Sequence, residues 1–328
     1  MKGEKCKEQI LIVKSMLCSL LFSIKATEPL HFEGKAKILY SLKKPAVQAF
    51  AARAEEAIFF GVYSYLKQQN DGLKKEMINM KALITGATSG IGRDMAALLS
   101  HMGYDLIIAS RNTHKMKQVQ KKLPTAVEII TVDLCRAEDC YQLYEAVKEQ
   151  EIDIVINNAG FGAFGPFSDI ALEKELDMID LNIKAVHILT KLFIKYFKER
   201  NKGYLLNVAS SAAFLPGPLM ATYYATKAYV LRLTEAVRKE LEKEGSAVKI
   251  SVLCPGPVDT AFCERANVSF QLKGMKSKRV AKYAIEKMLK GQMIIIPGKA
   301  MQLARIGERF LPERALLCIA YHIQNKKG

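Results

Sequence analysis

The sequence contains no Cys-x-x-Cys pair, and its seven cysteines are odd in number and scattered along the chain. Such a distribution argues against both a disulfide framework and a cysteine-based zinc site. The five histidines show no spacing typical of metal ligands either, so we predict no metal site. Reduced cysteines fit a cytoplasmic setting best, and we expect the protein to be cytoplasmic.

Long hydrophobic runs are also missing. The apolar run at residues 10–24 is interrupted by Lys14 and is too short to span a membrane. Lysines precede it, but no small-x-small cleavage site follows, which argues against a signal peptide. We predict that residues 1–79 form a helical N-terminal extension, with a second helix near residues 45–69, whose role the sequence does not reveal.

Acidic residues are scarce toward the C-terminal end. The net charge is +16, and residues 273–328 hold 13 Lys and Arg against 3 Asp and Glu, whereas residues 80–272 are nearly neutral. A basic segment suits an anionic substrate, an anionic membrane surface or a nucleic acid, although a solvated basic face is at least as common. Because no aromatic-interleaved basic motif or nucleic-acid module is present, we predict no nucleic-acid partner.

From Met80 onward, short apolar runs alternate with amphipathic helical patterns. Half of the residues are hydrophobic, which is enough for a sizeable core. Alternation of this kind is typical of a parallel sheet with helices on both faces, and ligands then bind at the carboxyl ends of the strands. We predict a doubly wound, Rossmann-type α/β fold whose seven parallel strands lie at residues 81–85, 104–109, 126–132, 152–157, 203–209, 247–254 and 292–296.

The first of these strands runs into a glycine-rich turn at residues 85–92, Thr-Gly-Ala-Thr-Ser-Gly-Ile-Gly, and a helix-like segment follows. Glycines let the backbone come close to a pyrophosphate, while the first N–H groups of the helix and its dipole favour the anion. The glycine spacing is one residue wider than the usual dinucleotide fingerprint. An ordinary strand-to-helix turn would look similar, so the motifs that follow decide between the two.

Further motifs stand at the carboxyl ends of the other predicted strands. They are Ala-Ser-Arg-Asn at 109–112, Val-Asp-Leu at 132–134, Asn-Asn-Ala-Gly at 157–160, Ser210, Tyr-Tyr-Ala-Thr-Lys at 223–227 and Pro-Gly-Pro-Val-Asp-Thr at 255–260, with Asn182 inside a helix. In this order the set resembles the short-chain dehydrogenase/reductase family, and within it the NAD(P)-dependent reductases of bacteria. The resemblance implies an NAD(P)-binding Rossmann catalytic domain at residues 80–298, followed by a basic amphipathic tail at 299–328.

The chemistry of carbonyl reduction explains why these residue types are needed. A hydride added to a carbonyl leaves a negative oxygen that must be protonated, and Tyr223 is the natural acid. Because the pKa of free tyrosine is about 10, we expect Lys227, one helical turn further on, to lower it by favouring tyrosinate. Ser210, which the family's spacing selects over Ser211, would hydrogen-bond the substrate oxygen. By resemblance, Asn182 holds a water that passes protons toward the lysine.

The end of the second predicted strand bears on the choice of cofactor. No carboxylate stands there to hold the ribose hydroxyl of NAD, whereas Arg111, next to Ser110, can pair with the extra phosphate of NADP. We therefore predict NADP (NADPH) in preference to NAD, with a solvated arginine as the alternative. By resemblance, Asp133 faces the adenine and Thr260 the nicotinamide carboxamide. The full set expected to bind the cofactor is Gly86, Thr88, Ser89, Gly90, Ile91, Gly92, Arg111, Asp133, Leu134, Asn158, Ala159, Gly160, Tyr223, Lys227, Pro255, Gly256, Val258 and Thr260.

Apolar and aromatic residues gather where the substrate is expected. Residues 161–167 and 214–216 suit an apolar carbonyl or alcohol, and residues 259–277 form a variable third side, although the phenylalanines would equally pack loops onto the sheet. The basic tail has three possible roles: covering the substrate mouth, lying on an anionic bilayer, or packing against its own fold or a partner subunit. Relatives usually associate through two long helices, here 171–199 and 222–244, which predicts a homodimer or homotetramer.

The leading hypothesis is therefore an NADP-dependent short-chain oxidoreductase that interconverts a carbonyl and an alcohol, with Tyr223 as acid and base. The alternatives are a catalytically silent NADP-binding sensor or scaffold and a membrane-docked lipid ketone reductase. The complete set of Asn182, Ser210, Tyr223 and Lys227 favours an enzyme, because a binding protein has no need of a proton donor. Tyr224 lacks a lysine four residues on, and we expect it to pack beside the site.

Overall fold

The computed structural model describes residues 80–260, 262, 274–308 and 310–325 of the chain. The helical extension expected at residues 1–79 lies outside these residues, as does most of the variable segment at 259–277.

A sheet of seven parallel strands confirms the predicted fold, and each strand lies where an apolar run predicts it. The strands are β1 (Lys81–Thr85), β2 (Asp105–Ser110), β3 (Val127–Thr131), β4 (Ile152–Asn157), β5 (Tyr204–Val208), β6 (Lys249–Leu253) and β9 (Ile294–Ile295). Their order across the sheet is β3-β2-β1-β4-β5-β6-β9, and every neighbouring pair is parallel.

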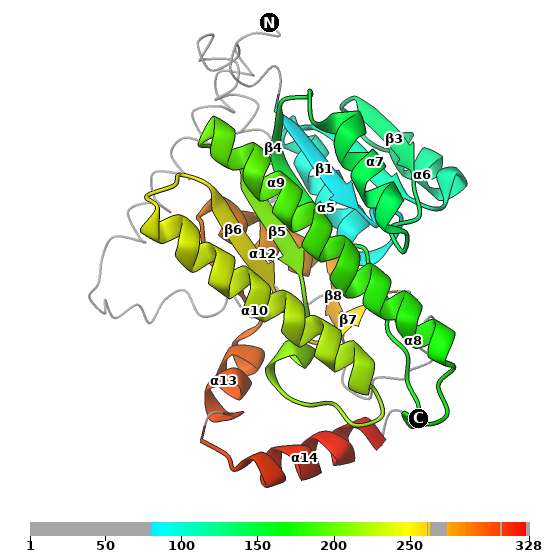
Figure 1. The fold of residues 1–328 in the computed structure, drawn as a ribbon, viewed down its shortest axis with the longest axis vertical. Helices are drawn as coiled ribbons and strands as arrows, with labels where there is room; N and C mark the ends of the chain where they lie inside the picture. The colour runs from blue at the N-terminus through cyan, green and yellow to red at the C-terminus, as the bar shows by residue number, and fades with distance from the viewer. Residues whose placement is uncertain (1–79, 261, 263–273, 309, 326–328) are drawn as a thin grey trace, which may run out of the picture. The chain divides into compact units, whose positions relative to one another are not determined.

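Helices cover both faces of the sheet, which is why its strands are almost continuously apolar (Figure 1). One face packs against α5 (Gly90–His101), α6 (Thr113–Gln120) and α12 (Ser277–Leu289). The other packs against α7 (Ala137–Val147), α9 (Val186–Arg200) and α10 (Ala221–Lys243). Two separate apolar layers therefore hold the sheet, and α10 begins at the predicted catalytic motif.

The long helix expected at residues 171–199 is present but not uniform. It consists of α8 (Leu172–Ile179), a π-helical segment η2 (Asp180–Ala185) and then α9. Wider π-helical turns inside α-helices are frequent at functional sites. Asn182 lies in this segment, so the irregularity falls at a predicted site residue.

Smaller elements gather beyond the carboxyl edge of the sheet. They include the short helix η3 (Ser211–Phe214), the parallel pair β7 (Val258–Asp259) and β8 (Met275–Lys276), and two C-terminal helices, α13 (Lys299–Glu308) and α14 (Glu313–Asn325). Figure 1 shows α13 and α14, in orange and red, beyond this edge. Among the described helices, none is both long enough and apolar enough to cross a membrane.

The topology places a crevice where β1 and β4 lie side by side. After β1 the chain enters α5 on one face, and after β4 it enters α8 and α9 on the other. Such a reversal at the carboxyl ends of neighbouring strands is where doubly wound folds bind their ligands. The predicted motifs lie at this edge of the sheet.

Candidate active site

The glycine turn between β1 and α5 is held in a conformation that other residues would not adopt easily. Gly86 and Gly90 have φ values of +69° and +56°, in the left-handed region that favours glycine. A Cβ atom added to Gly92 would lie 2.2 Å from the side-chain nitrogen of Asn158. That nitrogen donates to the carbonyl oxygens of Thr85 and Gly86, at 3.1 and 3.0 Å. The turn is therefore locked to the loop that follows β4.

Thr85 makes a second connection between these loops that the sequence did not reveal. Its hydroxyl oxygen accepts hydrogen bonds from the backbone N–H groups of Asn158 and Ala159, at 3.0 and 3.1 Å. The side chain is buried, so its hydroxyl replaces water for two backbone donors. A threonine at the end of an apolar strand carries no motif of its own, which is why it was not predicted.

Two cavities at the carboxyl edge of the sheet collect nearly all of the predicted cofactor residues. A cavity of about 190 Å³, here called the catalytic cavity, is lined by Ser89, Gly90, Ile91, Asn158, Gly160, Ser210, Tyr223, Lys227, Pro255, Gly256, Val258 and Thr260, among others. A second cavity of about 280 Å³ is lined by Gly86, Thr88, Arg111, Asp133, Leu134, Ala159 and Gly160, among others. Gly160 lines both, so the two cavities adjoin. Gly92 and Asn182 line neither cavity.

This pair of cavities fits an extended dinucleotide. The N-terminus of α5 lies between them, and the first N–H groups of a helix have no acceptor within the helix, which suits a pyrophosphate. At Gly92 the absence of a side chain leaves space for the ligand in the turn. At Gly160 it leaves space beside Lys227, whose Nζ would lie 3.2 Å from an added Cβ. The residues present therefore match the shape and charge of the group that the motifs imply.

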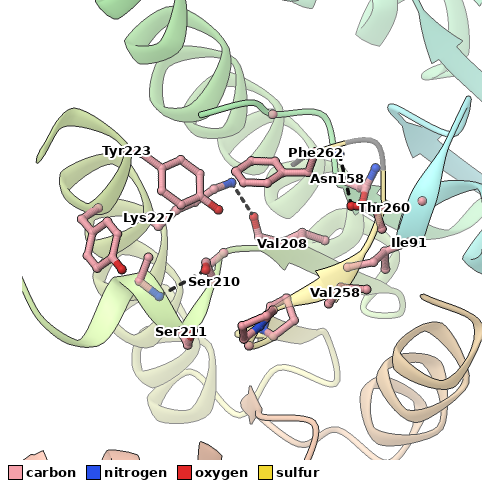
Figure 2. A pocket seen from close by; sticks show the side chains of 18 of the residues that line it. Ile91, Asn158, Val208, Ser210, Ser211, Tyr223, Lys227, Val258, Thr260 and Phe262 are labelled. Carbon is pink, nitrogen blue, oxygen red and sulfur yellow. Dashed lines mark hydrogen bonds between the residues drawn. The ribbon is translucent and has the colours of Figure 1, made fainter. Parts of the chain in front are cut away.

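Tyr223 and Lys227 lie one turn apart on α10 and both line the catalytic cavity (Figure 2). The Lys227 ammonium nitrogen lies 5.8 Å from the centre of the Tyr223 ring and donates to the backbone oxygen of Val208 at 3.1 Å. Phe262 covers the phenol ring, with the ring centres 5.3 Å apart. The α10 spacing thus brings together the acid and the cation that the sequence predicts.

Burial shifts the pKa values of Tyr223 and Lys227, and the shift of Tyr223 differs from the expected one. Desolvation raises the pKa of the Tyr223 phenol well above its usual 10.0, and a hydrogen bond with Ser210 opposes the rise only in part. Burial also lowers the pKa of the Lys227 ammonium from 10.5 to about 8. The phenol pKa is thus raised rather than lowered, with desolvation as the largest cause and Ser210 as the group that opposes it. Tyr223 consequently carries its proton at neutral pH.

Ser210 faces the same cavity and is tied to the turn that follows β5. Its hydroxyl oxygen accepts from the backbone N–H of Ala212 at 3.1 Å, at the start of η3. Ser211 also lines the cavity, but Ser210 is the serine whose hydroxyl lowers the pKa of the Tyr223 phenol on α10.

Asn182 lies close to these residues but its side chain is already occupied. Its amide nitrogen donates to the backbone oxygen of Phe161 at 2.9 Å and to the Thr226 hydroxyl at 3.1 Å. Its amide oxygen accepts from the Phe161 backbone N–H at 3.1 Å. The side chain is fully buried and joins η2, α10 and the loop after β4. A water-holding role for Asn182 stays a prediction; Thr226 is a partner that the sequence did not suggest.

The residues that bear on cofactor choice lie in the second cavity. Arg111 and Ser110 line it at the end of β2, and the Arg111 guanidinium lies 3.7 Å from the Asp133 carboxylate. The Arg111 side chain is 65% exposed, so this ion pair is weak and open to competition from another anion. Among the described residues that line this cavity, no carboxylate belongs to β2 or to the loop that follows it.

Tyr224 packs beside Tyr223 and also lines the wall of the catalytic cavity. Its ring packs edge-on against that of Tyr223, and its hydroxyl accepts a hydrogen bond from the Gln324 side chain on α14. Burial raises the pKa of its phenol to about 12. The C-terminal tail therefore contributes directly to the surroundings of the site.

Comparisons with known proteins agree with this geometry. The sequence model described as short chain dehydrogenase matches residues 80–269. An uncharacterized oxidoreductase of Staphylococcus epidermidis is 31% identical over 202 residues, which are 61% of this chain and 86% of that protein. One of Staphylococcus aureus is 34% identical over 195 residues, covering 58% of this chain and 84% of the relative.

Solved structures show the same similarity. A short-chain dehydrogenase from Sphingobium yanoikuyae in complex with NADPH is 28% identical, with a TM-score of 0.63, over 70% of this chain and 94% of that one. The bulky-bulky ketone specific alcohol dehydrogenase from Comamonas testosteroni is 26% identical, with a TM-score of 0.59, over 71% and 98%. A short chain dehydrogenase/reductase from Burkholderia phymatum in complex with NAD, 23% identical with a TM-score of 0.64 over 70% and 92%, shares the fold.

Proposed function

The chain belongs to the short-chain dehydrogenase family and is a dehydrogenase or reductase of CH–OH groups; from this premise we propose that it is an NADP-dependent enzyme in which Tyr223 transfers the proton. The observation that carries the proposal is the shared catalytic cavity of Ser210, Tyr223 and Lys227, which opens at the glycine turn. A catalytically silent sensor would not need these three side chains around one space.

Each of these side chains has a distinct task in the proposed reaction. Bound NADPH supplies the hydride that reaches the carbonyl carbon. Tyr223, which its raised pKa keeps protonated at neutral pH, donates this proton to the carbonyl oxygen. Because the raised pKa also makes the phenol a weaker acid, the tyrosinate that forms needs stabilisation. Lys227 stabilises the tyrosinate that remains. Ser210 donates a hydrogen bond to the same oxygen as charge develops on it, while Asn182 fixes the loop after β4 against α10.

The preference for NADP rests on the end of β2. Ser110 offers no negative charge to repel a phosphate, and the exposed Arg111 guanidinium can pair with one more strongly than it pairs with Asp133 at 3.7 Å. The relative from Sphingobium yanoikuyae, which is in complex with NADPH, supports this choice. Asp133 then faces the adenine side of the second cavity, and Thr260 the nicotinamide side of the catalytic cavity.

The substrate is proposed to be a small, apolar carbonyl or alcohol compound. The similarity to a bulky-bulky ketone specific alcohol dehydrogenase supports an apolar ketone. We further propose that residues 80–298 form the catalytic domain, that the helices over 171–199 and 222–244 join subunits in a homodimer or homotetramer, and that the enzyme works in the cytoplasm. The extension at residues 1–79 remains without a proposed role.

The surface of α13 and α14 favours a second feature, peripheral contact with a membrane. Leu303 and Phe310 are 68% and 82% exposed, and Ile306, Leu317 and Tyr321 are exposed as well. Large exposed apolar patches mark interaction sites, and this segment belongs to the most basic part of the chain. A lipid ketone reductase that docks through this tail is therefore the second candidate.

The decisive experiment is Tyr223→Phe, assayed with a panel of ketones and aldehydes by the loss of NADPH absorbance. We expect the variant to bind NADPH but to lose at least about a hundredfold in turnover, because a general acid contributes roughly that much. Tyr229→Phe is the matched control, since Tyr229 lies on the same helix with its hydroxyl bonded to His187 and lines neither cavity. Unchanged turnover in Tyr223→Phe would refute Tyr223 as the acid.

A further inference from the structure

The outer face of α12 is strongly basic. Residues 274–298, which include this helix, hold six Lys and Arg against a single acidic residue, Glu286. The apolar side chains of α12 pack against α5 and the sheet, so its charged side chains stand on the opposite face. Because residues 80–272 are nearly neutral, this helix is a main source of the positive field around the sheet.

The first turn of α12 lies beside the cofactor crevice. The strand β8 leads into it and pairs with β7 in a register that puts Lys276 opposite Asp259, the neighbour of Thr260 in the wall of the catalytic cavity. The Ser277 hydroxyl donates to the carboxylate of Asp94 on α5 at 2.5 Å. Since α12 precedes the parallel strand β9, it begins at the carboxyl edge of the sheet and ends at the amino edge. Only its first turn therefore lies at the edge that carries the site.

This first turn has charges that a helix of its own does not favour. Acidic residues stabilise a helix N-terminus, because they complement the positive end of its dipole, and basic residues do not. Here Lys276 is the N-cap residue without a capping hydrogen bond, Lys278 and Arg279 follow, and the turn holds no acidic residue. Asp94, which the turn contacts, is buried and already pairs with Arg93 at 2.9 Å. A segment that breaks a local rule in this way is expected where the charge has a function.

Screening decides which of the α12 cations can act on a ligand in the crevice. Lys278 and Arg279 are exposed on the first turn, next to α5, whose N-terminus suits a pyrophosphate. Lys287 and Lys290 stand at the other end of the helix, roughly 15 Å further along its axis. At 0.1 M ionic strength the Debye length is about 10 Å. The field of the first pair therefore extends over the crevice, whereas that of the second pair is screened before it arrives.

We propose that Lys278 and Arg279 form a steering surface for NADPH, which attracts the phosphates of the approaching cofactor toward the glycine turn and acts before contact is made. The inference rests on the proposed function, because it takes NADPH as the ligand of the crevice. Steering raises the association rate constant and changes the dissociation rate constant little, since the charges act at a distance. NADH, which lacks the additional phosphate, gains less.

The test measures both rate constants for the full chain by stopped-flow fluorescence of NADPH at 0.1 M and 1 M salt. In the double variant Lys278→Gln and Arg279→Gln we expect association at 0.1 M salt to be slowed about three- to tenfold, and dissociation to change less than about twofold. At 1 M salt, where the Debye length is about 3 Å, variant and wild type should associate equally fast. The loss should be smaller with NADH.

The other end of the same helix supplies the matched control. The double variant Lys287→Gln and Lys290→Gln removes the same charge and should keep association at 0.1 M salt within about twofold of the wild type. Reversing the charge, in Lys278→Glu and Arg279→Glu, should slow association further than the neutral variant does. Neither change at the first turn should lower Tm, because both remove cations from the positive end of a helix dipole. A normal Tm excludes damage to the fold as the cause of slow association.

The outcomes distinguish the two proposals. If the wild type binds no NADPH at either salt concentration, the proposed function fails, and steering fails with it. If NADPH binds but the two neutral double variants slow association equally, or the loss at the first turn persists at 1 M salt, the steering proposal alone fails. A loss that appears in the dissociation rate constant instead would also overturn it, because that result assigns the two cations to direct contact with the bound cofactor.

Discussion

At the scale of single residues, the lysine beside the phenol is the group that titrates in the working range. Burial brings the pKa of Lys227 to about 8, whereas that of Tyr223 is raised. The phenol therefore stays protonated across the neutral and mildly alkaline range, and the charge that stabilises tyrosinate is lost as Lys227 deprotonates. The raised pKa of Tyr223 keeps the proton donor protonated, whereas the lowered pKa of Lys227 removes the charge that stabilises tyrosinate. Of the two pKa values, only that of Lys227 lies near neutrality.

We predict that kcat/KM for ketone reduction falls as the pH rises through about 8, approaching a tenfold decrease per pH unit. The measurement is the pH profile with cyclohexanone and saturating NADPH. Lys227→Arg serves as the comparison, because a guanidinium stays charged beyond about pH 12. Whatever activity that variant retains should not show the decrease. A flat wild-type profile, or the same decrease in Lys227→Arg, contradicts the assignment.

Cofactor choice is also decided by single residues. We predict that Arg111→Ala lowers kcat/KM for NADPH roughly ten- to a hundredfold, the effect of a charged hydrogen-bond partner, and changes the value for NADH little. Ser110→Asp should shift the preference further toward NADH by repelling the phosphate. Arg136→Ala is the control, since Arg136 is similarly exposed, pairs with Asp139 and lines neither of the two cavities at the carboxyl edge of the sheet. Equal losses with both cofactors in Arg111→Ala would exclude a phosphate contact.

Sequence reasoning found the residues whose chemistry is local and missed those whose partners are distant. Tyr223 and Lys227 are one turn apart, so their spacing alone predicts their meeting. The contact between Gln324 and Tyr224 joins residues a hundred positions apart, and the Asn182 and Thr226 contact crosses two helices. The pKa of Tyr223 rises because the phenol is buried in the folded protein, and a single sequence does not specify that burial.

At the scale of elements, the turn between β1 and α5 depends on one close contact. An alanine at Gly92 would place its Cβ 2.2 Å from the Asn158 side-chain nitrogen and 2.7 Å from the Gly86 oxygen. Asn158 would have to move, and both of its hydrogen bonds to the turn would then be lost. The pyrophosphate site depends on the shape that these bonds maintain.

We predict that Gly92→Ala abolishes measurable NADPH binding and lowers the free energy of unfolding by about 1–3 kcal/mol through overpacking. Calorimetric titration and urea unfolding measure the two effects. Gly245→Ala is the control: its φ is +69° with no atom within 4 Å of an added Cβ, so it costs about 1–2 kcal/mol of backbone strain alone. That variant should lose stability and keep NADPH binding. Normal binding in Gly92→Ala would contradict the packing argument.

A layer of buried polar side chains joins β4 and β5 to α9 and α10, and the sequence did not predict its hydrogen bonds. The amide oxygen of Asn207 on β5 accepts from Asn157 at 2.9 Å and from Thr190 on α9 at 3.2 Å, and its nitrogen donates to Thr234 on α10 at 3.0 Å. All four side chains are buried. In the sequence Asn157 belongs to the Asn-Asn-Ala-Gly motif, but Thr190, Asn207 and Thr234 interrupt apolar patterns without forming a motif. Apolar periodicity predicted the strands and helices, but not the polar network that ties them together.

At the scale of the whole molecule, the sequence predicted the seven strands, their parallel direction and the edge of the sheet that carries the site, but not the order of the strands across the sheet. It could do so because a buried parallel strand must be apolar on both faces and each strand end carries its motif. The role of the tail at residues 299–328 could not be predicted, because its amphipathic pattern is equally compatible with a lid, a membrane contact or a packing surface. The structure gives the tail two faces, one that lines a cavity of about 830 Å³ beside η3 and one that exposes large apolar side chains.

The outer face of the tail leads to the last prediction. If α13 and α14 lie on an anionic bilayer, the full chain should float with phosphatidylserine-containing vesicles, less so at high salt, and not with neutral ones. The double variant Leu303→Ser and Phe310→Ser removes the two most exposed apolar side chains of the tail and should lose flotation while keeping NADPH binding. Tyr141→Ser, on α7 and 51% exposed, is the control and should float normally. Flotation that persists in the double variant excludes docking through the tail, and a change in its size-exclusion volume alone would instead assign this face to contact between subunits.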